Sequence, residues 1–130
     1  MDAQTRPDIE YLTSDQLKGL PFSEAVRVGS MLYLSGMIGI DSSMKLVPGG
    51  IAPETRQAME NMKAALERYG SSLDHVIKAT VMLADMSEWT RMNEVYVTYF
   101  PKHLPARSAL GANGLAFGAR VEIECIAVLQ

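Results

Sequence analysis

The sequence predicts a single α+β domain, residues 1–130, in which two helices pack on one face of a sheet. The apolar periodicity indicates the order strands, helix, strand, helix, strands. Two helices of this size are too few to cover both faces of such a sheet, so we expect both on the same face. The last strand, 120–129, carries apolar residues on both of its faces, which favours a partner chain against the open face.

The first predicted strands form a hairpin. The run Ala25–Val28 leads through Gly29 and Ser30 into the apolar run 31–35, a pattern typical of a tight turn between two strands. The first ten residues are largely polar and are predicted to be a poorly anchored end. Glycines and prolines between positions 36 and 50 predict a loop that includes Met37.

Two helices are predicted from apolar stripes at steps of three and four residues. Pro53 suits the first turn of the first helix, and Gly70 suits its end. The stripe of the first helix is Ala58, Met62, Ala65, Leu66 and Tyr69. The second helix is capped by Asp85 or Ser87 and ends before Pro101. Its stripe is Met92, Val95, Tyr96, Tyr99 and Phe100.

Three further strands are predicted, at 76–84, 108–112 and 120–129. Alternation in the first of these places on one face Ile77, Ala79, Val81 and Leu83. In the last, one face carries Val121, Ile123, Cys125 and Ala127, and the other carries Glu122, Glu124, Ile126 and Val128. Glycines between the last two strands predict a turn.

Composition excludes several classes of protein. Apolar residues make up 48% of the chain, which argues against disorder. A net charge of -3 gives no electrostatic reason to bind nucleic acid. The single Cys125 excludes an internal disulfide. Without a signal-peptide pattern or a membrane-length apolar run, we expect a soluble cytoplasmic protein.

Common catalytic motifs are absent from the sequence. His75, His103 and Cys125 have no zinc-site spacing, and the glycines form neither a P-loop nor a dinucleotide fingerprint. Cys125 lies in an apolar strand beside acidic residues, which favours an inert core thiol. We therefore expect no metal and no cofactor.

Arg107 and Glu122 are the strongest candidates for a functional role. Both lie in predicted strands, where an ionised group without a partner costs several kcal/mol. One interpretation is an ion pair, internal or between subunits, that fixes the register. The other is a site in which the Arg107 guanidinium binds a substrate carboxylate and Glu122 acts as a base toward water.

Short motifs occur along nearly the whole chain. They are Pro21-Phe22-Ser23-Glu24-Ala25-Val26, Leu34-Ser35-Gly36, Glu60-Asn61-Met62, Lys78-Ala79-Thr80-Val81, Asn93-Glu94-Val95-Tyr96, Pro105-Ala106-Arg107-Ser108 and Val121-Glu122-Ile123-Glu124. In their order and spacing, these motifs resemble the RidA family, also called YjgF/YER057c/UK114.

The resemblance implies a chorismate-mutase-like α+β fold with a mixed sheet, assembled as a homotrimer with active sites in the clefts between subunits. It also implies a hydrolase similar to 2-iminobutanoate/2-iminopropanoate deaminases, which converts enamine or imine acids to 2-oxo acids and ammonia without a cofactor. By position, Arg107 would hold the substrate carboxylate and Glu122 would activate water. Ser35 and Gly36 would line the pocket, and Asn93 would lie in the cleft.

The sequence departs from the familiar family pattern at three pocket positions. Phe22, Met37 and Ala109 stand where a tyrosine, a glutamine and a cysteine are usual. Each change removes a polar group from the expected cleft. We therefore expect a preference for imino acids that are bulkier or less polar than 2-aminoacrylate.

Three alternatives remain at this point. A dedicated catabolic deaminase, such as one for 2-aminomuconate, would use the same site. A non-catalytic protein that binds a small carboxylate would need Arg107 but gains nothing from the negative Glu122. An RNA-acting or chaperone-like protein is the weakest alternative, because the chain is acidic and lacks a basic, aromatic-lined surface pattern.

Overall fold

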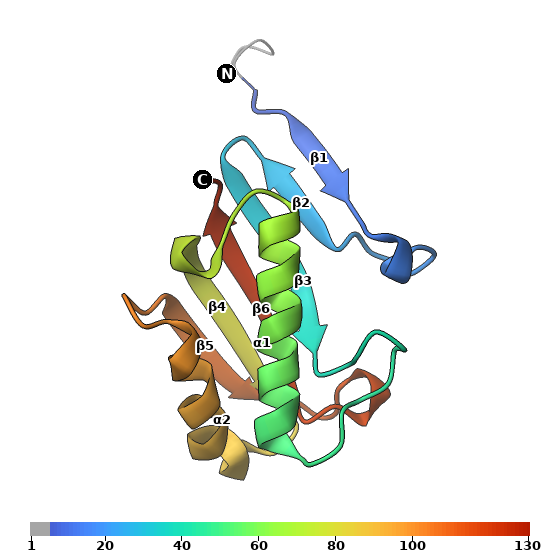
Figure 1. Cartoon of the computed structure of the whole chain (residues 1–130), viewed down its shortest axis with the longest axis vertical. Coiled ribbons are helices and arrows are strands. Elements are labelled where there is room, and N and C mark those ends of the chain that lie inside the picture. The colour runs from blue at the N-terminus through green and yellow to red at the C-terminus, as the bar shows by residue number, and fades with distance from the viewer. Residues whose placement is uncertain (1–5) are drawn as a thin grey trace.

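A computed structural model describes residues 6–130, which form one six-stranded sheet with two helices on the same face (Figure 1). The strands are β1 (Ile9–Leu12), β2 (Ala25–Val28), β3 (Met31–Ile38), β4 (Val76–Leu83), β5 (Ala106–Gly111) and β6 (Val121–Val128). Their order is β1-β2-β3-β6-β4-β5. Only the β4–β5 pair is parallel, so the sheet is mixed as expected.

The helix layer consists of α1 (Ile51–Arg68) and α2 (Trp89–Tyr96). Pro53 lies in the first turn of α1, and Gly70 follows its end with a φ of 91°, in the left-handed region that glycine accepts. Asp85 caps the short 3-10 turn before α2, because its side chain accepts a hydrogen bond from the Ser87 N–H. Both apolar stripes pack on the sheet and form the core, which confirms the predicted layers.

The first strand was not predicted. Ile9–Leu12 pairs with β2, so the expectation of a poorly anchored end is wrong from residue 9 onward; residues 1–5 lie outside the described chain. Three of the four β1 residues are exposed. Backbone pairing with β2, the Glu10–Arg27 ion pair and the packing of Leu12 against the core hold this strand. None of these contacts leaves a periodic signal in the sequence.

The loop predicted from position 36 begins later than expected. β3 continues through Gly36 and Met37 to Ile38, with a bulge between Leu34 and Met37. The glycine that suggested a loop instead marks the bulge. Met37 consequently lies in a strand, 7% exposed, and packs in the core.

A second bulge changes the faces of β4. Its register with β6 shifts between Val76 and Lys78, so Val76 is buried and Ile77 is 47% exposed. The assignment of Ile77 to the same face as Ala79 is therefore wrong, while Ala79, Val81 and Leu83 share one face, which is buried. The alternation predicted for β6 is confirmed throughout the strand.

In the part of the chain that is described, no helix has the length and apolar character needed to cross a membrane.

Candidate active site

Glu122 lies at the second position of β6, on the sheet face that carries no helix. The Glu122 carboxylate occupies the space that a side chain at position 36 would need, because a Cβ on Gly36 would collide with it. The β3 bulge and its glycine therefore make room for Glu122. Partial burial, together with the negative charge of Glu124, raises the pKa of the Glu122 carboxyl above its ordinary value.

Ser35 and Phe22 flank this carboxylate. Ser35 Oγ donates a hydrogen bond to the Ser23 carbonyl at 2.6 Å, and the Ser35 N–H donates to the Glu24 carbonyl at 2.9 Å. These two bonds fix the segment that carries Phe22 alongside β3. Phe22, Ser35, Gly36 and Glu122 all line one cavity of about 430 Å³, with Met37 in its wall.

Arg107 lies elsewhere, on the helix side of the sheet. Its Nη1 donates a hydrogen bond to Asn93 Oδ1 at 2.7 Å. The guanidinium carbon is 4.9 Å from the centre of the Tyr96 ring and 5.9 Å from that of Trp89, so aromatic faces of α2 hold the cation. Ala109, two residues further along β5, is half-buried on the same face.

Arg107 and Glu122 therefore lie on opposite faces of the sheet. Arg107 is paired with Ala79 of β4, whereas Glu122 is paired with Met82, three residues further along the strand. Side chains an odd number of residues apart on a strand point to opposite faces. The interpretation of an ion pair between Arg107 and Glu122 within one chain is thus wrong. Within one chain, the predicted site residues form two separate groups, one around Glu122 and one around Arg107.

Sequence reasoning missed a charged cluster at the cavity wall. Glu24, 6% exposed, accepts hydrogen bonds from Arg68 Nη1 and from the Tyr69 hydroxyl, each at 2.6 Å. Burial is the main cause that raises the Tyr69 pKa. The only signal for this cluster was the acidic residue that follows Phe22 and Ser23 in an otherwise apolar hairpin.

Sequence reasoning also missed two apolar cavity residues, Met44 and Phe117. Both adopt a positive φ, 63° and 62° respectively. Neither residue type favours this conformation, so composition gave no signal for either.

Among residues 6–130, no group of three histidine, cysteine or carboxylate side chains is placed to hold a metal ion. Cys125 is buried, and burial raises its pKa to about 12, so the thiol is protonated at neutral pH.

The model of one protein family, described as Endoribonuclease L-PSP, matches residues 15–129. Curated relatives match over most of their own length. The mouse 2-iminobutanoate/2-iminopropanoate deaminase is 48% identical over 109 residues, covering 83% of this chain and 81% of the relative. The chain belongs to the RidA family. The human protein of the same name is 44% identical over 109 residues, covering 83% of this chain and 80% of the relative.

Solved structures of family members share the fold. RidA from the Antarctic bacterium Psychrobacter sp. superposes with a TM-score of 0.86 at 36% identity, covering 92% of this chain and 99% of that one. Yeast Mmf1 gives a TM-score of 0.88 at 33% identity, covering 95% and 100%. The mixed sheet with both helices on one face is therefore the fold of the RidA family.

Proposed function

We propose that this chain is an enamine/imine deaminase that hydrolyses reactive 2-imino acids to 2-oxo acids and ammonia. The mouse and human relatives, 48% and 44% identical, are named as such deaminases. The chain also carries Arg107 and Glu122, to which the family resemblance assigns these roles. The observation that carries the proposal is Glu122: a partly buried carboxylate with a raised pKa, facing a cavity, has the properties of a base that works near neutral pH.

The reaction needs one anchor and one acid/base group. Arg107 binds the substrate carboxylate, and its bond to Asn93 uses one guanidinium N–H while the others stay available. The enamine first tautomerises to the imine. Glu122 accepts a proton from water as the oxygen bonds to the imine carbon, and the imine nitrogen takes up a proton to give a carbinolamine. The C–N bond then breaks as the amine takes the proton held by Glu122 and the hydroxyl gives up its own, which releases ammonia and leaves the 2-oxo group. A positioned acid/base group contributes roughly 10²–10⁴-fold, which suits imines that also hydrolyse slowly in water.

The assembly that completes this site is part of the proposal. One chain holds Arg107 and Glu122 on opposite faces of the sheet, so a single substrate cannot contact both. Exposed apolar residues on the open face, including Tyr11, Tyr33 and Leu110, support contact with another copy. We propose a homotrimer in which Arg107 of one copy faces Glu122 of the next.

The test measures ammonia and 2-oxo acid release from imines freshly generated by an amino acid oxidase. Arg107→Ala and Glu122→Gln are each expected to lower kcat/KM by about 10²-fold or more, because each removes one of the two required groups. Arg91→Ala is the matched control, since Arg91 is an exposed α2 arginine paired only with Glu94.

Full activity in Glu122→Gln would overturn the role of Glu122 as the base. No acceleration by the folded wild-type protein on any imine would overturn the deaminase proposal as a whole. Dissociation of the assembly in either variant would instead favour an ion pair between subunits.

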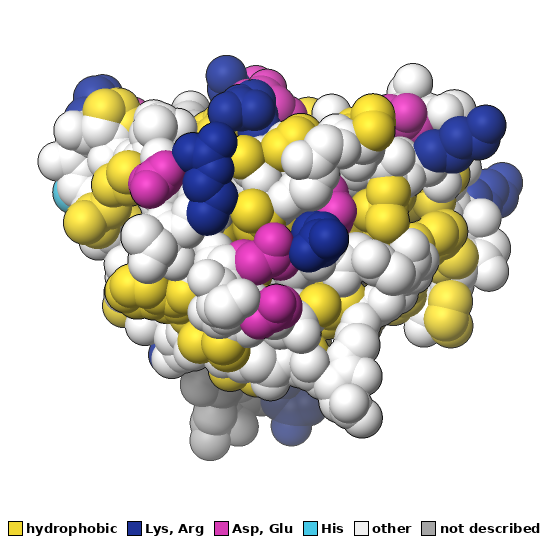
Figure 2. All heavy atoms as spheres, turned by 90° about the horizontal axis from the view of Figure 1, so that it is seen from below, with side chains coloured by type: hydrophobic (Ala, Val, Ile, Leu, Met, Phe, Trp, Pro, Cys, Tyr) yellow, Lys and Arg dark blue, Asp and Glu magenta, His cyan; other side chains and the backbone are white. Residues whose placement is uncertain are grey.

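A second candidate is a non-catalytic protein that binds a small carboxylate. It is favoured by the position of Arg107, which α2 orients before any ligand arrives. Calorimetric titration with a 2-oxo acid distinguishes the two candidates, because binding without imine turnover supports only this one. An RNA-acting protein is not supported by the face in Figure 2, where basic side chains are interspersed with acidic and apolar ones.

A further inference from the structure

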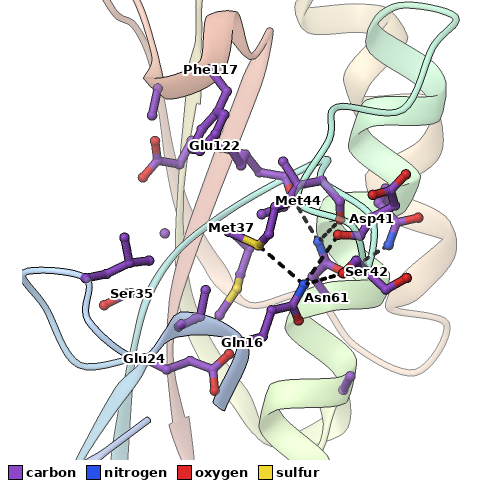
Figure 3. A pocket seen from close by; sticks show the side chains of 18 of the residues that line it. Gln16, Glu24, Ser35, Met37, Asp41, Ser42, Met44, Asn61, Phe117 and Glu122 are labelled. Atoms are coloured by element: carbon purple, nitrogen blue, oxygen red, sulfur yellow. Dashed lines mark hydrogen bonds between the residues drawn. The ribbon is translucent and has the colours of Figure 1, made fainter. Parts of the chain in front are cut away.

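The cavity at Glu122 continues past the free edge of β3. β2 pairs with β3 only up to Leu34, so β3 beyond this point has no neighbouring strand on that side. Figure 3 shows Glu122 and Ser35 on one side of β3, and Asn61 on the side of α1. The same cavity reaches Leu17, Leu20, Ile40 and Met44, which we call the apolar wing.

One side of α1 forms a wall of the cavity. Gln57, Asn61, Ala64 and Arg68 all line it, and they follow one another at steps of three or four residues along the helix. Ala64 is exposed and has the smallest side chain of the four. The small side chain of Ala64 therefore leaves space in the cavity beside α1, and Ala64 itself is not part of the core.

Polar groups around the wing are already bonded within the protein. Asn61 Nδ2 donates to the carbonyls of Ile38 and Ile40, at 3.0 and 2.9 Å. Asp41 Oδ1 accepts bonds from Ser43 and Lys45, and Glu24 is bonded to Arg68. A ligand group that enters the wing gains little from new hydrogen bonds, so the wing favours an apolar group.

Met44 and Phe117 are the only non-glycine residues with a positive φ in the described chain, and both line this cavity. A left-handed conformation is costly for such side chains and clusters at ligand sites. Phe117 is 64% exposed, so burial of its own ring does not explain its conformation. The two residues present large apolar side chains to the cavity from two separate loops.

A three- or four-carbon imino acid does not fill this space, since cavities of roughly 300–1,000 Å³ hold much larger ligands. We propose that the apolar wing binds the side chain of the substrate, and that this chain prefers 2-imino acids with large aliphatic or thioether side chains, such as those derived from leucine and methionine. This inference rests on the proposed function. It assigns specificity to the wing rather than to Ala109, which lies on the other face.

The test compares two substitutions at one exposed position. Ala64→Leu narrows the cavity, and Ala64→Ser keeps its size. The measured quantity is the ratio of kcat/KM for the leucine-derived imine to that for the alanine-derived imine, with the protein in its native assembly. Wild type and Ala64→Ser are expected to prefer the leucine-derived imine by about tenfold or more, and Ala64→Leu is expected to lose most of that preference.

Calorimetric binding of the two corresponding 2-oxo acids gives a readout that needs no turnover. Tighter binding of the leucine-derived acid, reduced in Ala64→Leu alone, supports the wing even if no imine is hydrolysed. Imine hydrolysis with an unchanged ratio in Ala64→Leu overturns the wing and leaves the proposed function intact. Equal binding of the two 2-oxo acids by the wild-type protein also overturns it.

Discussion

At the scale of single residues, Glu122 shows how a strand can hold a base. Alternation places it on the face away from the core, and the missing side chain of Gly36 gives it space. Burial and the neighbouring Glu124 both disfavour its charged form, and the described residues supply no donor or cation that offsets them. Its raised pKa follows from burial and from the charge of Glu124, and a substitution at Glu124 removes only the second cause.

The pH dependence of kcat/KM is expected to report this pKa. Glu122 must be deprotonated to act as a base, so activity should rise as pH increases through its pKa. Glu124→Gln removes the like charge two residues away and is expected to move this acidic limb to lower pH. The measurement is a kcat/KM profile for both proteins from about pH 4 to pH 8, a range that brackets the titration of a carboxyl with a raised pKa.

Glu60→Gln is the control, because it removes a carboxylate on α1 that does not line the cavity. If the acidic limb of the kcat/KM profile stays at the same pH in Glu124→Gln, or moves to higher pH, it does not report the titration of Glu122.

At the scale of elements, the sequence predicted what periodicity can encode. Both helices, the hairpin and the alternation in β6 follow directly from apolar spacing. Strand β1 and the two bulges did not, because backbone pairing and a one-residue change of register leave no periodic pattern. The bulge at Ser35 and Gly36 matters most, since it shapes the site.

Asn61 joins the helix layer to the end of β3. Its Nδ2 bonds to the Ile38 and Ile40 carbonyls connect α1 with the strand that lines the cavity. Asn61→Asp keeps the size of the side chain and removes both donors. We expect it to lower the free energy of unfolding by about 1–3 kcal/mol, the cost of leaving such groups unpaired.

Urea denaturation at one fixed protein concentration measures this change, since any assembly makes stability depend on concentration. Lys63→Ala, an exposed change on the same helix, is the control and is expected to stay within about 0.5 kcal/mol of wild type. If the two variants have the same stability, Asn61 does not connect the layers as described.

At the scale of the whole molecule, the predicted site residues of one chain divide into two groups, which the sequence did not predict. One group lines a single cavity and consists of Phe22, Ser35, Gly36, Met37 and Glu122. The pair of Arg107 and Asn93 lies on the other face, because the parallel register of β5 with β4 sets its side. Cross-strand register depends on contacts distant in sequence, which local patterns do not contain.

A site shared between copies predicts complementation. Arg107→Ala and Glu122→Gln are each expected to be inactive, yet co-expression of the two should restore activity. Random assembly of a ring with head-to-tail contacts gives about a quarter of the clefts both intact residues. The measurement is imine hydrolysis by the co-purified mixture, with light scattering to establish its mass. Activity no higher than that of the separate variants would contradict a shared site.

The position of β6 in the sheet constrains how the chain folds during synthesis. β6 is the last strand to be made, yet it lies between β3 and β4. Until Val121–Val128 has left the ribosome, no strand can join β1-β2-β3 to β4-β5, and the edges of β3 and β4 that β6 later pairs with stay unpaired. Unpaired edges are sites of aggregation. The two parts of the sheet can therefore join only after β6 has been translated, and chaperones that cover exposed strand edges should matter most before that point.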